Sequence, residues 1–100
     1  MNSTDTDTKH EVISDMIEEH DGFVIEAKIT KCVYWGQIIY VSGIGVYHGE
    51  IRHLTHECYK SNTSLDALMS DFDYDMRTAK HRGEATQRYA KQYAQSLVEA

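Results

Sequence analysis

The longest regular feature of this sequence is a helical pattern that fills its last third. Apolar residues recur there at the spacing of one helix face. They form two successive stripes: Leu65, Leu68, Met69, Phe72, Met76 and Ala79, then Ala85, Tyr89, Ala90, Tyr93, Ala94, Leu97 and Val98. One helix over 65–98 would be about 51 Å long, whereas a globule of this chain length is roughly 30–35 Å across. We therefore expect a break near His81-Arg82-Gly83, or else an overhang that is buried by a partner, such as a second copy in a homodimer.

The middle of the chain has the period of two that is typical of strands. Apolar Phe23, Ile25, Ala27 and Ile29 alternate with Val24 and polar residues. A second strand is indicated over 37–42, and the β pattern continues to about residue 56. Glycines at 43, 45 and 49 interrupt it, which indicates bulges and a curved sheet. Thr63 or Ser64 is expected to cap the helix that follows.

The first twenty residues indicate a polar tail and a short helix. Residues 1–7 are polar and are expected to form a flexible tail. Val12, Ile13, Met16 and Ile17 then follow the spacing i, i+1, i+4, i+5 of one helix stripe, and Asp21-Gly22 would end that helix.

Together these patterns predict the α+β class and one domain over 8–100. We expect a short N-terminal helix over 8–20 and a curved antiparallel sheet of three or four strands. A C-terminal helical pair, or one long helix, would cover one face of the sheet.

The net charge of −6 lies entirely in the first half of the sequence. Residues 1–50 carry nine acids and three bases, whereas residues 51–100 carry seven of each. Five of the acids fall within the predicted first helix or directly after it: Glu11, Asp15, Glu18, Glu19 and Asp21. We expect this cluster to contact a basic patch on a partner protein. Protonation of the six histidines would cancel the charge, so this binding should weaken on mild acidification.

Several classes of protein are disfavoured by composition and motifs. No apolar run reaches 18 residues, and the N-terminus lacks the pattern of a secretory signal. With only two cysteines, reduced thiols in a cytoplasmic protein are expected rather than a disulfide framework. We find no nucleophile elbow, dinucleotide fingerprint or phosphate-binding loop, and therefore expect neither catalysis nor a cofactor.

One cluster could bind zinc. His48, His53, His56 and Cys58 offer imidazole and thiolate ligands at usable spacings. On a regular strand His53 and His56 would point to opposite faces, and the second close pair of ligands typical of structural zinc sites is missing. A small zinc-binding domain therefore stands as an alternative only.

A second alternative rests on a local resemblance. A segment of about 12 residues resembles the final helix of double-stranded RNA-binding domains, and an αβββα order would match that family. The residues that carry the resemblance are Gly83, Thr86, Gln87, Arg88, Ala90, Lys91 and Ala94. The resemblance implies nucleic-acid binding through basic C-terminal helices. The chain has no proline, so the proline-containing loop of the family is absent. The acidic total charge also disfavours a binder of phosphate backbones.

Aromatic residues supply the remaining candidate site. Tyr34 and Trp35 precede a turn at Gly36, while Tyr89 and Tyr93 lie one helical turn apart. Such side chains often anchor protein interfaces. We expect a small acidic, non-catalytic protein that acts as an inhibitor or an adaptor by occluding a surface of another protein. This profile is similar to that of phage-encoded antagonists of host defence and of toxin-immunity proteins, a likeness of class only.

Overall fold

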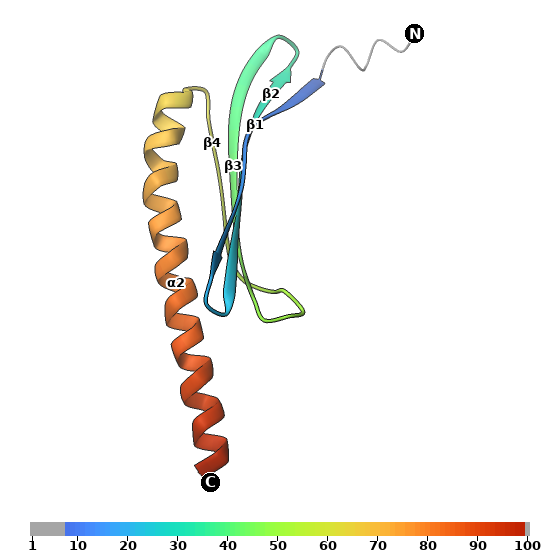
Figure 1. Ribbon diagram of the computed structural model, residues 1–100. Helices are drawn as coiled ribbons and strands as arrows, with labels where there is room; N and C mark the ends of the chain where they lie inside the picture. Colours follow the sequence, from blue (N-terminus) through green and yellow to red (C-terminus); the bar gives the residue numbers. More distant parts are fainter. Residues whose placement is uncertain (1–7, 100) are drawn as a thin grey trace.

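Four antiparallel strands and one long helix make up the fold. The computed structural model describes residues 8–99 (Figure 1), so the predicted flexible tail at 1–7 lies outside the described residues. The elements are β1 (Thr8–His20), β2 (Phe23–Tyr34), β3 (Gln37–His48), β4 (His53–Asn62) and α2 (Leu65–Glu99). The strands lie in sequence order, each antiparallel to its neighbour. The α+β class, the antiparallel sheet and the helix on one face are thus confirmed.

The predicted N-terminal helix is wrong, because residues 8–20 form the edge strand β1. A bulge at Ile13 explains the misleading pattern: the register with β2 shifts between Val12 and Ser14. The extra residue moves the following side chains to the opposite faces. Val12 and Ile17 therefore share one face, while Met16 lies on the other. A bulged strand can reproduce the apolar spacing of a helix.

Tight two-residue turns join β1 to β2 and β2 to β3. Asp21-Gly22 connects the paired ends His20 and Phe23, and Gly22 has a φ of 88°. At the next turn Trp35 and Gly36 have φ values of 55° and 81°. Positive φ at both central residues is the geometry of the hairpin turn that matches strand twist, and glycine adopts it without strain.

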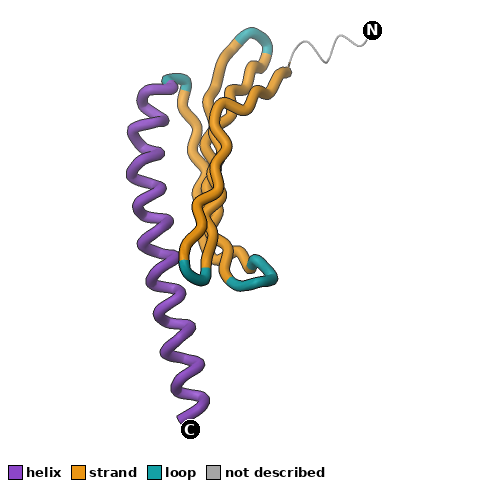
Figure 2. Tube along the Cα trace, in the orientation of Figure 1, coloured by secondary structure: helices purple, strands orange, loops and turns teal. Residues whose placement is uncertain are grey.

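The core lies between one face of the sheet and α2 (Figure 2). Ile25 and Ile29 of β2 and Ile44 and Val46 of β3 are at most 2% exposed. Leu68, Phe72 and Ala79 of α2 pack on them. The helix packs mainly on β3 and β4 and less on β2, while β1 lies largely outside its cover. Burying each large aliphatic side chain contributes about 1.5–3 kcal/mol.

Polar contacts fix both the start of α2 and its middle. The Ser64 hydroxyl accepts a hydrogen bond from the amide of Ala67 at 3.3 Å, which confirms Ser64 as the cap. Further along, the Lys60 ammonium of β4 donates to the carboxylate of Asp75 at 3.0 Å. Asp75 is only 7% exposed, so this pair ties the buried face of α2 to the sheet.

The expected break at 81–83 is also wrong, because α2 is continuous for 35 residues. Gly83 does not end the helix but leaves room for a side chain of the sheet. A Cβ at this position would lie 2.4 Å from the ring of Phe23. The glycine therefore lets the helix backbone approach the ring, and the buried contact offsets its low helix propensity.

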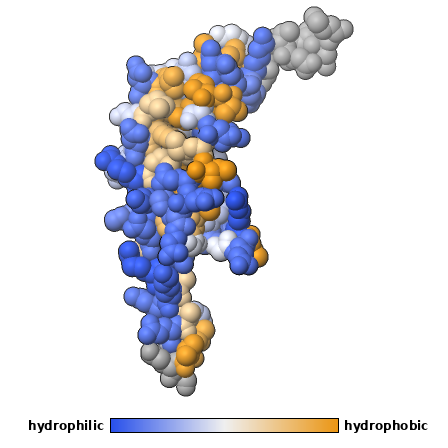
Figure 3. Space-filling model, in the orientation of Figure 1, coloured by the Kyte–Doolittle hydropathy of each residue, from blue (hydrophilic) through white to orange (hydrophobic). Residues whose placement is uncertain are grey.

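The uninterrupted helix gives the molecule an elongated shape. Its extents are 65 × 31 × 17 Å, and its radius of gyration is 17.8 Å, against about 13 Å for a compact chain of this length. In Figure 1, α2 runs past the turns at one end of the sheet. Every residue from 88 to 98 is exposed, and Figure 3 shows hydrophobic side chains at this end of α2. The overhang considered from the sequence is therefore present.

Candidate partner-binding surface

The sheet has one face covered by α2 and one that is uncovered, which we call the open face. The pairing register assigns alternate residues of each strand to it. Its central members are Asp15, Ile17 and Glu19 of β1, Glu26, Lys28 and Thr30 of β2, Val41, Gly43, Gly45 and Tyr47 of β3, and Glu57 and Tyr59 of β4. Ile17 and Tyr59 are 60% and 69% exposed. This face therefore combines apolar, aromatic and charged groups in contact with solvent.

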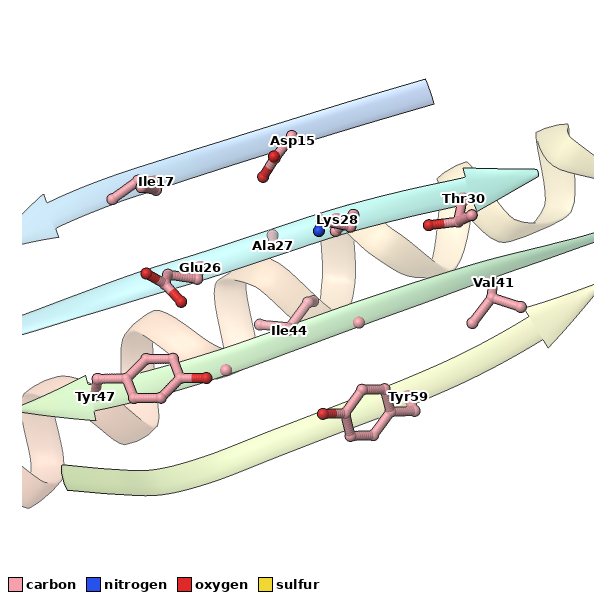
Figure 4. A pocket seen from close by; sticks show the side chains of 12 residues that line it. Asp15, Ile17, Glu26, Ala27, Lys28, Thr30, Val41, Ile44, Tyr47 and Tyr59 are labelled. Carbon is pink, nitrogen blue, oxygen red and sulfur yellow. The ribbon is translucent and has the colours of Figure 1, made fainter. Parts of the chain in front are cut away.

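A hollow of about 520 Å³ lies at the centre of the open face (Figure 4). It exists because β3 carries no side chains at Gly43 and Gly45. The rings of two tyrosines lie against these glycines: an added Cβ would be 3.1 Å from the Tyr59 ring and 2.8 Å from the Tyr47 ring. Aromatic cover of strand glycines shields the bare backbone. The result is a depression with a backbone floor and aromatic walls.

Asp15, Glu26 and Lys28 line the hollow, and on the open face as a whole the carboxylates outnumber the basic groups. The register places Asp15, Glu19, Glu26 and Glu57 on the open face, whereas Lys28 is a basic residue there. Glu26 also accepts a hydrogen bond from the Arg52 guanidinium at 2.9 Å, in an exposed ion pair from the β3–β4 turn. This contact shows that a guanidinium can reach a carboxylate at the rim of the hollow.

Glu57 links the charge of the open face to its aromatic wall. The Tyr59 hydroxyl donates to Glu57 at 3.2 Å. The adjacent negative charge raises the pKa of Tyr59, so the ring stays neutral and keeps its proton for donation. A neutral ring beside carboxylates is a suitable surface for a cationic side chain.

Three polar side chains meet at the far end of the open face. The Sγ of Cys32 lies 3.7 Å from the Nδ1 of His10. The His10 ring also packs edge-on against Tyr34, with centroids 5.7 Å apart. A hydrogen bond with Cys32 raises the pKa of Tyr34. Cys32 is 3% exposed, so this cluster closes one end of the surface.

The predicted acidic cluster is present, but it does not form one helix face. Because β1 is a strand, Asp15 and Glu19 lie on the open face, whereas Glu11 and Glu18 lie on the opposite side. Asp21 stands in the β1–β2 turn with a side chain 97% exposed and 3.8 Å from Lys91. Only two of the five predicted acids therefore lie on the open face, and of these Asp15 lines the hollow.

The predicted aromatic anchors are also separated. Trp35 is 78% exposed in the β2–β3 turn, and Tyr34 is half-buried beside it. Tyr89 and Tyr93 are 70% and 57% exposed near the C-terminal end of α2. The structure thus divides the predicted aromatic anchors between the two ends of the molecule.

The hollow itself was missed from the sequence, although a signal for it is present. Gly43, Gly45 and Tyr47 share one parity along β3, opposite to that of the apolar Ile44 and Val46. Glycines on the solvent-facing parity of a strand indicate a bare patch of backbone. Tyr59 could be placed there only once the register of β4 was known.

The histidine and cysteine cluster takes an arrangement that the sequence did not predict. A register shift between Val46 and Tyr47 places His53 and His56 on the same side of the sheet, toward the helix, not on opposite faces. Even so, no three His, Cys, Asp or Glu side chains within residues 8–99 come close enough together to hold a metal ion. Instead, the Nδ1 of His48 lies 3.2 Å from Gln87 Oε1, and the His48 ring stacks on Phe23.

The order αβββα, on which the resemblance to double-stranded RNA-binding domains depended, is not present. The chain begins its described part with a strand and has one helix, giving ββββα. The basic residues of α2 are exposed along it: Arg77, Lys80, Arg82, Arg88 and Lys91.

Comparisons with known proteins assign no family to this arrangement. Within the described residues, no helix has an apolar stretch long enough to span a membrane. The chain matches no protein-family model, no curated protein and no solved structure.

Proposed function

We propose that this protein is a non-catalytic binding protein whose open face holds a basic segment of another protein. The observation that supports this proposal most directly is the hollow between Tyr47 and Tyr59, with Asp15 and Glu26 beside it. Aromatic walls and carboxylates complement a lysine or arginine side chain by charge and by cation–π attraction. Covering the partner in this way would make the protein an inhibitor or an adaptor.

Each group has a separate role in this proposal. The exposed carboxylates attract the partner and raise the rate of association, an effect that salt screens. The apolar and aromatic groups, among them Ile17 and Tyr59, supply the buried contact that holds it. Arg52 already forms an ion pair with Glu26 at the rim of the hollow. A partner arginine that binds Glu26 would therefore displace Arg52 instead of meeting an unpaired carboxylate.

The first test uses the two faces of β1 as matched controls. Asp15→Asn with Glu19→Gln removes two charges from the open face, while Glu11→Gln with Glu18→Gln removes two from the opposite side. The partner is captured from cells that make the protein and identified, and its affinity for each variant is measured at about 50 mM and 300 mM salt. We expect the open-face pair to weaken binding several-fold at low salt and the control pair to change it little.

A second variant tests the hollow without changing charge. Gly45→Val fills the floor next to the Tyr47 ring, which can move because it borders solvent. Binding should fall at least tenfold while thermal stability changes little. The proposal is overturned if the two double variants change the affinity for the partner equally, or if Gly45→Val binds the partner as tightly as the wild type does. It is also overturned if nucleic acid is captured in place of a protein.

A further inference from the structure

The free end of α2, residues 89–98, carries an apolar stripe that packs on nothing in the described part of the chain. This stripe continues the face that α2 packs on the sheet. Along the whole helix, the residues of this face are separated alternately by four and three positions in the sequence. They are Phe72, Met76, Ala79, Gly83, Thr86, Ala90, Tyr93 and Leu97. Phe72 and Ala79 are buried against the sheet, whereas Tyr93 and Leu97 are 57% and 61% exposed. A heptad spacing of this kind is that of helices that pair with other helices.

We propose that the free end of α2 pairs antiparallel with the free end of a second copy, forming a two-fold symmetric dimer. Symmetric self-pairing is the commonest arrangement of soluble oligomers. Here it extends over the part of α2 that lies beyond the sheet, about 15 Å of helix. This inference is independent of the proposed function, because it uses the opposite end of the molecule from Trp35 and none of the hollow.

The side chains of the stripe are complementary to themselves. With the two-fold axis near residues 93 and 94, Ala90 of one copy faces Leu97 of the other, and Tyr93 lies beside the other copy's Ala94. Large residues therefore meet small ones, which allows close packing of the two helices. The charged residues Arg88 and Lys91 lie away from the stripe, so like charges do not oppose the pairing.

The end of the sheet fits the same arrangement. The backbone of α2 runs past the β1–β2 and β3–β4 turns (Figures 1 and 2), and the stripe continues the side of α2 that packs on the sheet, so it borders the space just past these turns. An antiparallel second helix occupies this space, and its last turn then meets the end of the sheet. Ile51, in the β3–β4 turn, is 89% exposed at that end. The dimer thus supplies a neighbour for another exposed apolar side chain.

The available area sets the expected strength. Tyr89, which lies next to the stripe, is 70% exposed, and it and Tyr93 each contribute about 100–150 Å². With Leu97, the alanines and the contact at the sheet end, the total buried area is on the order of 1,000 Å². That is near the lower limit for specific interfaces, so we expect a weak dimer whose formation depends on protein concentration.

The mass of the protein in solution tests the proposal directly. Sedimentation velocity from about 1 to 200 μM should show the wild type passing from monomer to dimer. Leu97→Glu should remain monomeric over this range. Val98→Glu is the matched control, because Val98 is 86% exposed but lies about 100° around the helix from Leu97. Neither side chain is buried in the monomer, so both variants should fold, as circular dichroism will check.

Cross-linking tests the orientation of the two helices. In a Cys58→Ser background, a mixture of A90C and L97C chains should form a disulfide between unlike copies, whereas either chain alone should link poorly. Efficient linking of A90C to itself would mean parallel pairing and would overturn the proposed geometry. The proposal that a second copy covers the stripe would be overturned if the wild type is still monomeric at 200 μM. It would also be overturned if Leu97→Glu and Val98→Glu dimerise to the same extent.

Discussion

Replacing Gly83 by alanine should destabilise this protein, although the same change stabilises most helices. In an exposed helix interior, alanine is favoured over glycine by about 1 kcal/mol. Here the new methyl group would lie 2.4, 2.6 and 2.9 Å from three carbons of the Phe23 ring. Ordinary carbon contacts need roughly 3.5–4 Å, so the helix and the ring would have to separate by about 1 Å.

The Phe23 ring has little freedom to yield. It is 4% exposed and stacks between His20 and His48, with centroid distances of 4.7 and 5.3 Å. Overpacking of a well-filled core costs about 1–3 kcal/mol, and the confined ring places this site at the upper end. Subtracting the gain in helix propensity leaves a loss of about 2 kcal/mol, or roughly 8–16 °C in Tm for a domain of this size.

Thermal and urea unfolding of Gly83→Ala and of the double variant with Phe23→Leu measure this effect. The smaller leucine should relieve the clash, so the two changes together should cost at least 1 kcal/mol less than their separate effects added. An exposed helix change, Ser70→Ala, controls for propensity alone and should leave Tm almost unchanged. A Tm for Gly83→Ala equal to or above that of the wild type would refute the close-approach argument.

Three further outcomes can be checked with similar samples. Burial and the nearby Asp75 raise the pKa of the Cys58 thiol, so iodoacetamide at pH 8 should modify it more slowly than a free thiol; equal rates would contradict this. The Lys60 pKa is also raised, by its hydrogen bond to Asp75. The folded chain therefore holds more protons than the unfolded one above about pH 9, and urea unfolding should show stability falling from pH 9 to 11; a flat profile would count against it. Trp35→Asn, at a φ of 55°, should raise Tm by a few degrees because asparagine tolerates this conformation; an unchanged Tm would mean that the turn is unstrained.

The sequence predicted best those elements whose pattern is undisturbed along the chain. The alternation from Phe23 to Ile29 correctly identified β2, and of the two predicted cap candidates, Thr63 and Ser64, Ser64 is the cap. Both depend on neighbours in sequence. The first element was wrong because the bulge at Ile13 gives a strand the spacing of a helix, and a bulge is fixed by pairing with β2.

The errors at the helix and at the candidate site have a related cause. Gly83 looked like a breaker because the ring that needs the space, Phe23, is sixty residues away in sequence. The hollow depends in the same way on Tyr59 meeting Gly43 across two strands. Contacts of this kind follow from strand register, which hydrophobic periodicity alone does not specify.

The simple succession of the strands has a consequence for how the chain folds. Each strand pairs with the next one along the chain, so the whole sheet forms from local hairpins with short loop closures, which favours rapid folding. The covering helix follows all four strands along the chain, so it leaves the ribosome after them. Until it docks, Ile25, Ile29, Ile44 and Val46 line an exposed apolar sheet with two free edges. The interval between sheet formation and helix docking is therefore the stage at which this protein is most exposed to aggregation.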